Sequence, residues 1–315
     1  MTSGTRTSDL RTRRDEAHAL GGAGDPQRAA ELLTELSPAF DQTFGPDHLD
    51  SLELRDKLAI WVGDGGEPAR AVAILEPVLQ RRQAIQGPEH PDTLFTLHSL
   101  WYFTGEAGNI PAASAGMREL LPVRERVLGP EHHDTLITRH AVAYWLAEEG
   151  NAADAVTLLR ELLPIRRRVL GDADPYTLRT LHELGRRTGE AGDPVHAVTL
   201  LDDALRQRVK VLGDEHPHTL TSRHERARWT GEAGDAATAV TMLDELLPVR
   251  RRVQGPSHQR TLATWHELAR WAAVFGDTQK AVAMLRELLP VRENALGGDH
   301  PHVRATRELL DTLTS

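Results

Sequence analysis

The chain has 315 residues, of which 40% are hydrophobic and 26% are charged, and its formal net charge is −9 at pH 7. This acidic balance argues against nucleic-acid partners, because binding to a phosphate backbone needs a basic stripe. No apolar run is long enough to span a membrane, and the polar start of the chain has no signal-peptide core. The absence of cysteine excludes disulfides, thiolate nucleophiles and zinc–thiolate sites. We therefore expect a cytoplasmic protein with neither nucleic-acid nor membrane partners.

A glycine recurs every 42 residues along the chain. This fixed interval indicates one structural unit copied in tandem, with a single continuous core in place of the two domains that the length alone favours. Residues 1–7 precede the first copy and are expected to be disordered. The glycines that mark the copies are Gly45, Gly87, Gly129, Gly171, Gly213, Gly255 and Gly297.

Each copy has the pattern of a helical hairpin. In the third copy, Pro91 suits the first turn of a helix, and leucines at helical spacing from Leu94 predict a helix to about residue 107. Gly108 and Asn109 combine a helix stop with an N-cap, which predicts a tight turn into a second helix. A proline such as Pro122 in that second helix predicts a bend or a short break. Repeats are expected at about 8–49, 50–90, 91–132, 133–174, 175–216, 217–258 and 259–300, with a capping helix at 301–313.

The order Leu-x-x-Leu, Gly-Asn/Asp, Ala-x-x-x-Leu and Leu-Gly-x-x-His-Pro resembles the tetratricopeptide repeat, and more closely the 42-residue variety of kinesin light chains and many actinobacterial repeat proteins. HEAT and armadillo repeats have a similar period, but these residues decide against them. The resemblance covers residues 8 to about 312. It implies an all-α fold, an α-solenoid of seven antiparallel helical hairpins in a right-handed superhelix whose first helices line a concave groove. It also implies a non-enzymatic scaffold that binds a protein or peptide segment.

A column of histidines occupies the first helix of five copies. The resemblance places this column in the groove, where kinesin-light-chain repeats commonly have an asparagine that hydrogen-bonds an extended peptide. Histidine can donate or accept in the same way. The alternative is a half-buried histidine bonded to a neighbouring helix, and the sequence leaves both open. The column consists of His98, His140, His182, His224 and His266, with Arg14 and Asp56 at this place in the first two copies.

A second column lies four residues further along the same helices and consists of Tyr102, Tyr144, Arg186, Arg228 and Arg270. Positions i and i+4 share a helix face, so we expect these residues to line the groove beside the histidines and to bind the partner. The groove would be aromatic toward one end and cationic toward the other, which fits a ligand with apolar residues followed by acidic ones. The alternative is that each arginine pairs with a glutamate of its own helix, as Arg186 and Glu190 would.

Three further columns are predicted to be structural. Histidines of the loops, such as His90, are expected to cap helices rather than bind a metal. The arginines late in the second helices are expected to pack their stems and reach a helix end or an acidic loop residue; they are Arg82, Arg124, Arg166, Arg208, Arg250 and Arg292. The aromatic residues are expected to fill the seams between hairpins, with a weaker seam where Arg187 interrupts them; they are Trp61, Phe103, Trp145, Trp229 and Trp271.

The sequence offers little for catalysis. It has neither a Gly-x-Ser-x-Gly elbow nor a phosphate-binding loop. Histidines on adjacent helices, about 8–10 Å apart, lie too far from one another to share a zinc ion. We therefore expect no enzymatic activity, no cofactor and no metal. The alternative function is a regulatory or sensor array that binds a small molecule or controls a partner signalling ATPase or enzyme.

Overall fold

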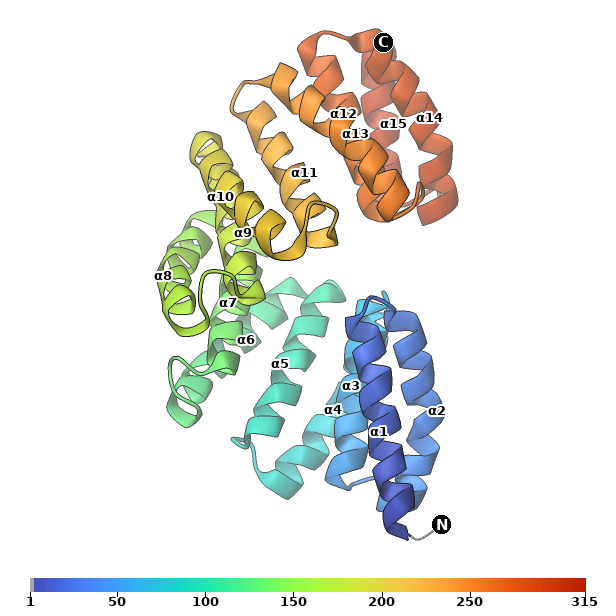
Figure 1. Ribbon diagram of the computed structural model, residues 1–315, viewed down its shortest axis with the longest axis vertical. Helices are drawn as coiled ribbons and strands as arrows, with labels where there is room; N and C mark the ends of the chain where they lie inside the picture. The colour runs from blue at the N-terminus through green and yellow to red at the C-terminus, as the bar shows by residue number, and fades with distance from the viewer. Residues whose placement is uncertain (1–2) are drawn as a thin grey trace. The chain divides into compact units, whose positions relative to one another are not determined.

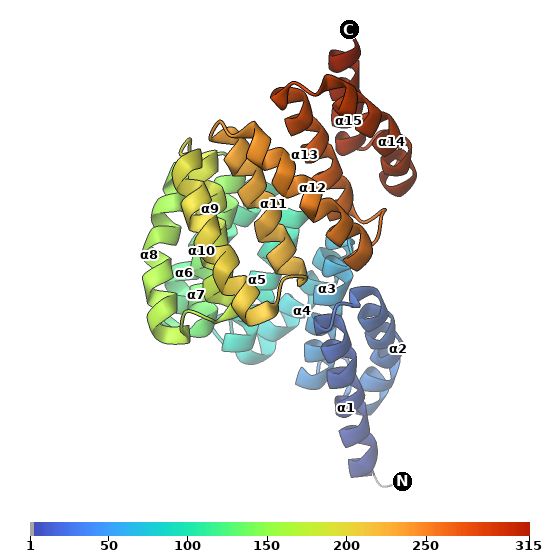
Figure 2. The same cartoon turned by 45° about the horizontal axis from the view of Figure 1, so that its top comes forward.

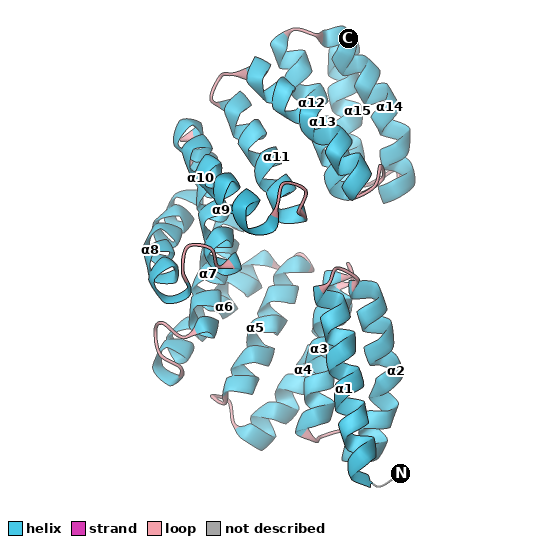
Figure 3. Cartoon of the chain, in the orientation of Figure 1, coloured by secondary structure: helices cyan, strands magenta, loops and turns pink. Residues whose placement is uncertain are grey.

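The computed structural model describes residues 3–315, with side chains from residue 7 onward. The regular structure of these residues is entirely helical, as Figure 1 and Figure 3 show. The helices are α1 (Ser3–Gly22), α2 (Pro26–Phe44), α3 (Leu49–Asp64), α4 (Pro68–Gln86), α5 (Pro91–Glu106), α6 (Ile110–Val127), α7 (His133–Glu148), α8 (Ala152–Leu170), α9 (Pro175–Glu190), α10 (Pro194–Leu212), α11 (Pro217–Glu232), α12 (Ala236–Val253), α13 (Gln259–Phe275), α14 (Thr278–Leu296) and α15 (Pro301–Thr314).

These helices form seven hairpins, from α1–α2 to α13–α14, followed by the single helix α15; Figure 2 shows the succession from a second direction. The all-α array of seven helical hairpins with a terminal helix is thus confirmed. Helix α1 begins at Ser3, and the first two residues of the segment expected to be disordered, 1 and 2, lie outside the described residues. The helices group into two compact units, one up to Ala155 and the other from Val156. The expected single continuous domain over residues 8–315 remains a prediction.

Glycines with positive φ make the joints. Gly87 between hairpins and Gly108 within one have φ of 90° and 101°, a region that side-chain-bearing residues rarely adopt. His90 follows and caps α5, because its Nδ1 accepts the Asp92 N–H at 3.2 Å. The histidines at this place in five other copies make the same contact, and Asp174 caps α9 in the fifth. The capping role predicted for the loop histidines is confirmed.

The prolines of the second helices do not break them, so the prediction of a break is wrong. Helix α6 runs from Ile110 to Val127 through Pro122. Pro122 lies on the exposed side of the helix, where water can reach the carbonyl of Arg118 that loses its N–H partner. The other prolines of this column, Pro38, Pro164, Pro248 and Pro290, are exposed within continuous helices as well.

The aromatic column fills the seams, as predicted. Each ring packs on a glycine of the preceding hairpin, forty positions earlier in the chain. A Cβ built on Gly105 would lie 2.3 Å from the ring of Trp145, and one on Gly231 would lie 2.4 Å from that of Trp271. Gly21, Gly63 and Gly189 meet Trp61, Phe103 and Trp229 in the same way. Arg187 instead forms ion pairs with Glu183 and Glu190 of its own helix, and the predicted weaker seam beside it remains a prediction.

The arginines late in the second helices are buried, and five of their guanidinium groups bind backbone carbonyls at the start of a helix. Arg124 donates to the backbone carbonyls of Asp134 and Leu94, at 2.8 and 2.9 Å, and to the hydroxyl of Thr138 at 2.9 Å. Both carbonyls belong to the first turns of their helices, α7 and α5, so the guanidinium reaches helix ends, the first of the two predicted alternatives, and not an acidic loop residue. Arg166, Arg208, Arg250 and Arg292 likewise donate to the carbonyl ten residues further on.

Candidate functional site

The histidine column lies on the first helices of the hairpins, here called the A helices: α1, α3, α5, α7, α9, α11 and α13. Its side chains are buried or half-buried, and four of them contact a hydroxyl of the next A helix or of α15. His224 Nδ1 lies 3.2 Å from the hydroxyl of Thr264, and His266 Nδ1 lies 3.4 Å from that of Thr306. His98 and His182 make the equivalent contacts to Thr138 and Ser222, and His140 is 4% exposed. The contacts predicted by the second alternative, in which a half-buried histidine bonds a neighbouring helix, are thus present in four copies.

The tautomer of these histidines follows from their partners. The hydroxyl of Thr264 donates its only proton to the carbonyl of Arg260 at 3.0 Å, so it can only accept from His224. Nδ1 of His224 therefore carries the proton, and Nε2 is left with a lone pair. Thr306 donates to the carbonyl of His302 at 2.8 Å in the same way, so Nδ1 of His266 carries the proton as well. The two imidazoles can thus accept a hydrogen bond from a ligand N–H at Nε2.

Burial keeps three histidines of the column uncharged. It lowers the pKa of His224 and of His266 to about 4, and it lowers the pKa of His182 well below its usual 6.5. Neighbouring arginines add to this shift, since a cationic imidazole would be repelled by them. At neutral pH these side chains are neutral hydrogen-bonding groups and contribute no positive charge to the surface.

The aromatic half of the second column lies in the N-terminal unit. Tyr102 is partly exposed and meets Phe103 edge-on, with ring centroids 5.3 Å apart. It also meets Trp145 of the next A helix at 5.9 Å. Tyr144 packs edge-on against Trp145 at 4.9 Å. The two tyrosines therefore rest on the seam aromatics while part of each ring faces outward.

The arginine half lies in the C-terminal unit, and its members differ in how they are paired. Arg186 donates to Glu190 of its own helix at 3.0 Å, as the alternative reading proposed. Arg270 donates to Glu267 at 2.7 Å and to Glu232 of the preceding A helix at 2.9 Å.

Arg228 lies between these two arginines in the column and forms weaker contacts with carboxylates. Its nearest carboxylate oxygen, on Glu225, is 3.7 Å away, and its guanidinium lies 4.7 Å from the ring centre of Trp229. Within the described part of the chain it forms no hydrogen bond, and its side chain is 35% exposed. Glu225 belongs to an acidic column that sequence reasoning missed, together with Glu183 and Glu267. Burial raises the pKa of Glu225, and its Oε2 has no hydrogen-bond partner among the described residues.

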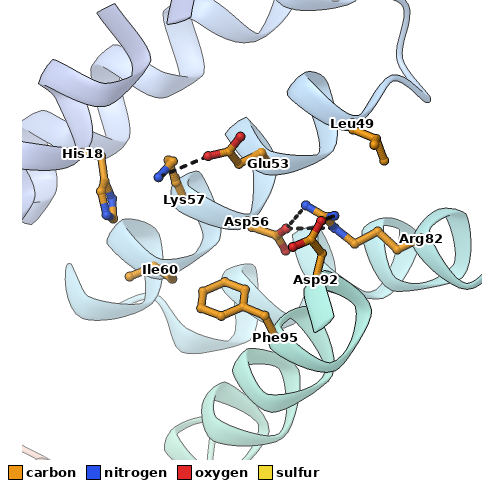
Figure 4. A pocket seen from close by; sticks show the side chains of 9 residues that line it. All are labelled: His18, Leu49, Glu53, Asp56, Lys57, Ile60, Arg82, Asp92 and Phe95. Carbon is orange, nitrogen blue, oxygen red and sulfur yellow. Dashed lines mark hydrogen bonds and ion pairs between the residues drawn. The ribbon is translucent and has the colours of Figure 1, made fainter. Parts of the chain in front are cut away.

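The N-terminal unit contains a pocket of about 490 Å³ on the A helices, lined from α1, α3, α4 and α5 (Figure 4). His18 and Lys57 lie at one side of it and Asp56 with Arg82 at the other, above Phe95. His18 Nδ1 accepts the indole N–H of Trp61 at 3.0 Å, so Nε2 carries the proton. Because the lining residues come from four helices between His18 and Phe95, spacing within one helix did not reveal this pocket.

Asp56 explains why Arg82 departs from the other buried arginines. Its Oδ2 accepts from Nε and Nη2 of Arg82 at 3.1 and 2.7 Å, and its Oδ1 accepts from the hydroxyl of Thr96 at 2.9 Å. The carboxylate thus draws the guanidinium away from the carbonyl oxygens that its equivalents bind. Burial raises the pKa of Asp56 to about 6, against the opposing attraction of Arg82. Arg82 thus has an acidic partner, but that partner lies within helix α3 and not in a loop as predicted.

The described residues contain no group of three or more His, Asp or Glu side chains arranged to hold a metal ion. None of the helices described is long and apolar enough to cross a bilayer.

Tetratricopeptide repeat family models match residues 51–92, 142–208 and 226–294, which together make up more than half of the chain. No match was found among curated proteins. The nearly identical repeats of a Podosopora anserina protein assigned to the kinesin light chains are 28% identical, cover 66% of this chain and 99% of their own, and superpose with a TM-score of 0.56.

Two Rap proteins share the fold at lower identity. The apo form of RapI is 12% identical over 97% of this chain and 82% of its own, with a TM-score of 0.62. A Rap protein complexed with competence and sporulation factor is 11% identical over 98% of each chain, with a TM-score of 0.54. The family matches agree with the repeat seen in sequence and structure: this chain belongs to the tetratricopeptide repeat family, and its repeats are similar to those of the protein assigned to the kinesin light chains.

Proposed function

We propose that this protein is a non-enzymatic interaction scaffold that binds a protein or peptide segment along its A helices. The observation that carries the proposal is Arg228, a partly exposed guanidinium without a hydrogen bond among the described residues, between two arginines that are paired with carboxylates. Repeat proteins bind through surfaces where copies differ, and an under-used cation is a place for a ligand carboxylate.

The neighbouring side chains of α11 support a peptide ligand. His224 lies one turn before Arg228 on the same helix face, and its Nε2 is an acceptor. The helix therefore presents an acceptor for a peptide N–H beside a donor for an acidic side chain. In the N-terminal unit, the partly exposed rings of Tyr102 and Tyr144 would contact apolar residues of the ligand.

The test uses a peptide selected by display against the whole protein, with binding followed by fluorescence anisotropy. Arg228→Ala should weaken binding by about tenfold or more, since a hydrogen bond to a charged group contributes about 1.5–3 kcal/mol. Arg206→Ala is the matched control, because that side chain is 73% exposed on α10, the second helix of its hairpin. Equal affinity of the Arg228→Ala variant and the parent protein would refute binding at this surface.

The second candidate is a regulatory array that senses a small molecule, and the pocket beside Asp56 favours it. Its volume of about 490 Å³ and its mixed lining of cations, carboxylates and Phe95 suit a small polar ligand. A thermal shift on adding a nucleotide or metabolite, lost in Lys57→Ala, would support this function. No shift with any compound of such a panel would count against it.

A further inference from the structure

Hairpin α5–α6 differs from the other six hairpins at one pair of facing positions. It has Trp101 on the A helix and Gly116 on the second helix. Elsewhere the A-helix residue is small and its partner is large. In the fifth hairpin the two positions face each other closely, since a Cβ on Gly185 would lie 3.3 Å from the Cβ of Leu200. The other pairs are Ala17 and Leu32, Ala59 and Ile74, Ala143 and Leu158, Ala227 and Met242, and Ala269 and Met284.

Trp101 and Gly116 are complementary in size: the large residue lies on the A helix and the small one on the second helix. A Cβ on Gly116 would lie 2.3 Å from the indole of Trp101, so a leucine at that place could not coexist with the ring. Ala59 and Ala227 are fully buried at the equivalent position, whereas Trp101 stays partly exposed. An indole is large enough to fill the gap that the glycine leaves and still reach solvent.

Trp101 lines a groove of about 480 Å³ in the N-terminal unit, together with Leu97, Leu120 and Val123. The charged residues that line it are Glu89 and Glu119. Glu89 is held by Arg126 through two hydrogen bonds of 2.6 and 2.7 Å, which cancels its charge locally.

Glu119 is exposed and forms no ion pair among the residues that the structure describes. The groove is therefore apolar and carries one uncompensated negative charge.

We propose that this groove binds an arginine side chain of a partner protein. The alkyl stem packs on Leu97 and Val123, the guanidinium lies against the indole of Trp101, and its N–H groups reach Glu119. Arginine is the cation that stacks best on an aromatic face, and its stem covers apolar surface. The groove is lined from α4, the α4–α5 joint, α5 and α6, so this contact does not involve Arg228 and goes beyond the proposed function.

The test uses the whole protein labelled with fluorotryptophan, in which fluorine NMR reports on the six tryptophans. Trp101→Phe identifies the signal of Trp101. Acetyl-Leu-Arg-Leu-amide should shift that signal saturably, with a dissociation constant on the order of 1 mM for so small a probe. The citrulline analogue, which is neutral and of nearly the same shape, should bind about tenfold more weakly. Equal binding of the two peptides, or no shift of the Trp101 signal, would overturn the proposal.

Two variants separate recognition from folding. Trp101→Ala with Gly116→Leu restores the small–large pair of the other hairpins, so the fold should persist while binding of the arginine peptide is lost. Glu119→Gln should weaken binding about three- to fivefold, and Glu161→Gln, at the equivalent place on α8, should have no effect. If the double variant binds normally, or if it unfolds and Glu119→Gln leaves affinity unchanged, the assignment fails.

Discussion

The contact between Gly105 and Trp145 makes a sharp prediction about stability. Gly105 lies inside helix α5, where glycine is normally a cost: replacing it by alanine should stabilise the helix by about 0.5–1 kcal/mol. The ring of Trp145 reverses that expectation. The new methyl would lie 2.3 Å from Cη2 of the indole, whereas carbon atoms pack at about 3.5–4.0 Å.

The magnitude follows from how little the ring can move. Trp145 is 2% exposed, so relief requires a shift of more than an ångström by the indole or by α5. Overpacking of this kind costs about 1–3 kcal/mol and sometimes more. After the gain in helix propensity is subtracted, Gly105→Ala should destabilise the protein by about 1–2 kcal/mol.

Urea unfolding followed by circular dichroism and tryptophan fluorescence measures this change. Gly22→Ala is the control, because Gly22 also lies in a helix but no atom comes within 4 Å of its added Cβ. It should be neutral or slightly stabilising. In a Trp145→Ala background, itself costly, Gly105→Ala should become neutral or favourable, which gives a coupling energy of about 2 kcal/mol. A Gly105→Ala protein as stable as the parent, or a double-variant cycle without coupling, would refute this account of the seam.

Three other predictions concern buried polar groups. Burial lowers the pKa of His224 and His266 to about 4, so the stability that the two neutral side chains give the folded state is fully present above pH 6.5 and is lost as the pH falls toward 4. The loss in free energy of unfolding is at most about 3 kcal/mol for each histidine. Urea unfolding midpoints at pH 7 and pH 4.5 measure it. Arg250→Met should cost about 2–4 kcal/mol in the same assay at pH 7, because two buried carbonyls lose their donor. Asp56→Asn should cost about 3–5 kcal/mol, because the buried Arg82 would keep only the exposed Asp92 as a carboxylate partner, while Asp56→His should recover most of that loss. Equal urea midpoints for Asp56→Asn and Asp56→His would contradict this prediction.

The sequence was sufficient for the fold because its signals are local and repeat. The glycine joints, the histidine caps and the leucine spacing each act within a few residues, and all of them appear where the pattern predicts. The Gly105–Trp145 seam was anticipated from the aromatic column alone, although the glycine that receives each ring was not recognised. The signal was present: the position forty residues before each aromatic is a glycine, and before Arg187 it is Ala147.

The candidate site was harder to predict, because side-chain pairing depends on how successive helices lie against each other. Whether His224 faces a ligand or Thr264 depends on the neighbouring helix, and spacing within one helix leaves both open. Arg270 was assigned to its column from spacing within one helix, and its bond to Glu232 of another helix could not be inferred from that spacing. The pocket at Asp56 is lined from four helices, so its residues come together only when those helices pack in register.

Within a repeat array, repetition itself separates the two kinds of residue. A side chain that must hold one hairpin against the next faces the same neighbour in every copy, so the same residue type serves each time. The histidine column fits this description, since it recurs in five copies and its members that bond Thr138, Ser222, Thr264 and Thr306 do so at one and the same register.

A ligand breaks that equivalence, because it meets only some copies and needs different chemistry at each. The places where this chain departs from its own repeat are thus the better candidates for binding. Asp56 in the histidine column, Trp101 opposite Gly116, and Arg228 without the carboxylate bonds of its equivalents are such departures. Asp56 lines a pocket and Trp101 lines a groove, and Arg228 is a partly exposed cation without a hydrogen bond among the described residues.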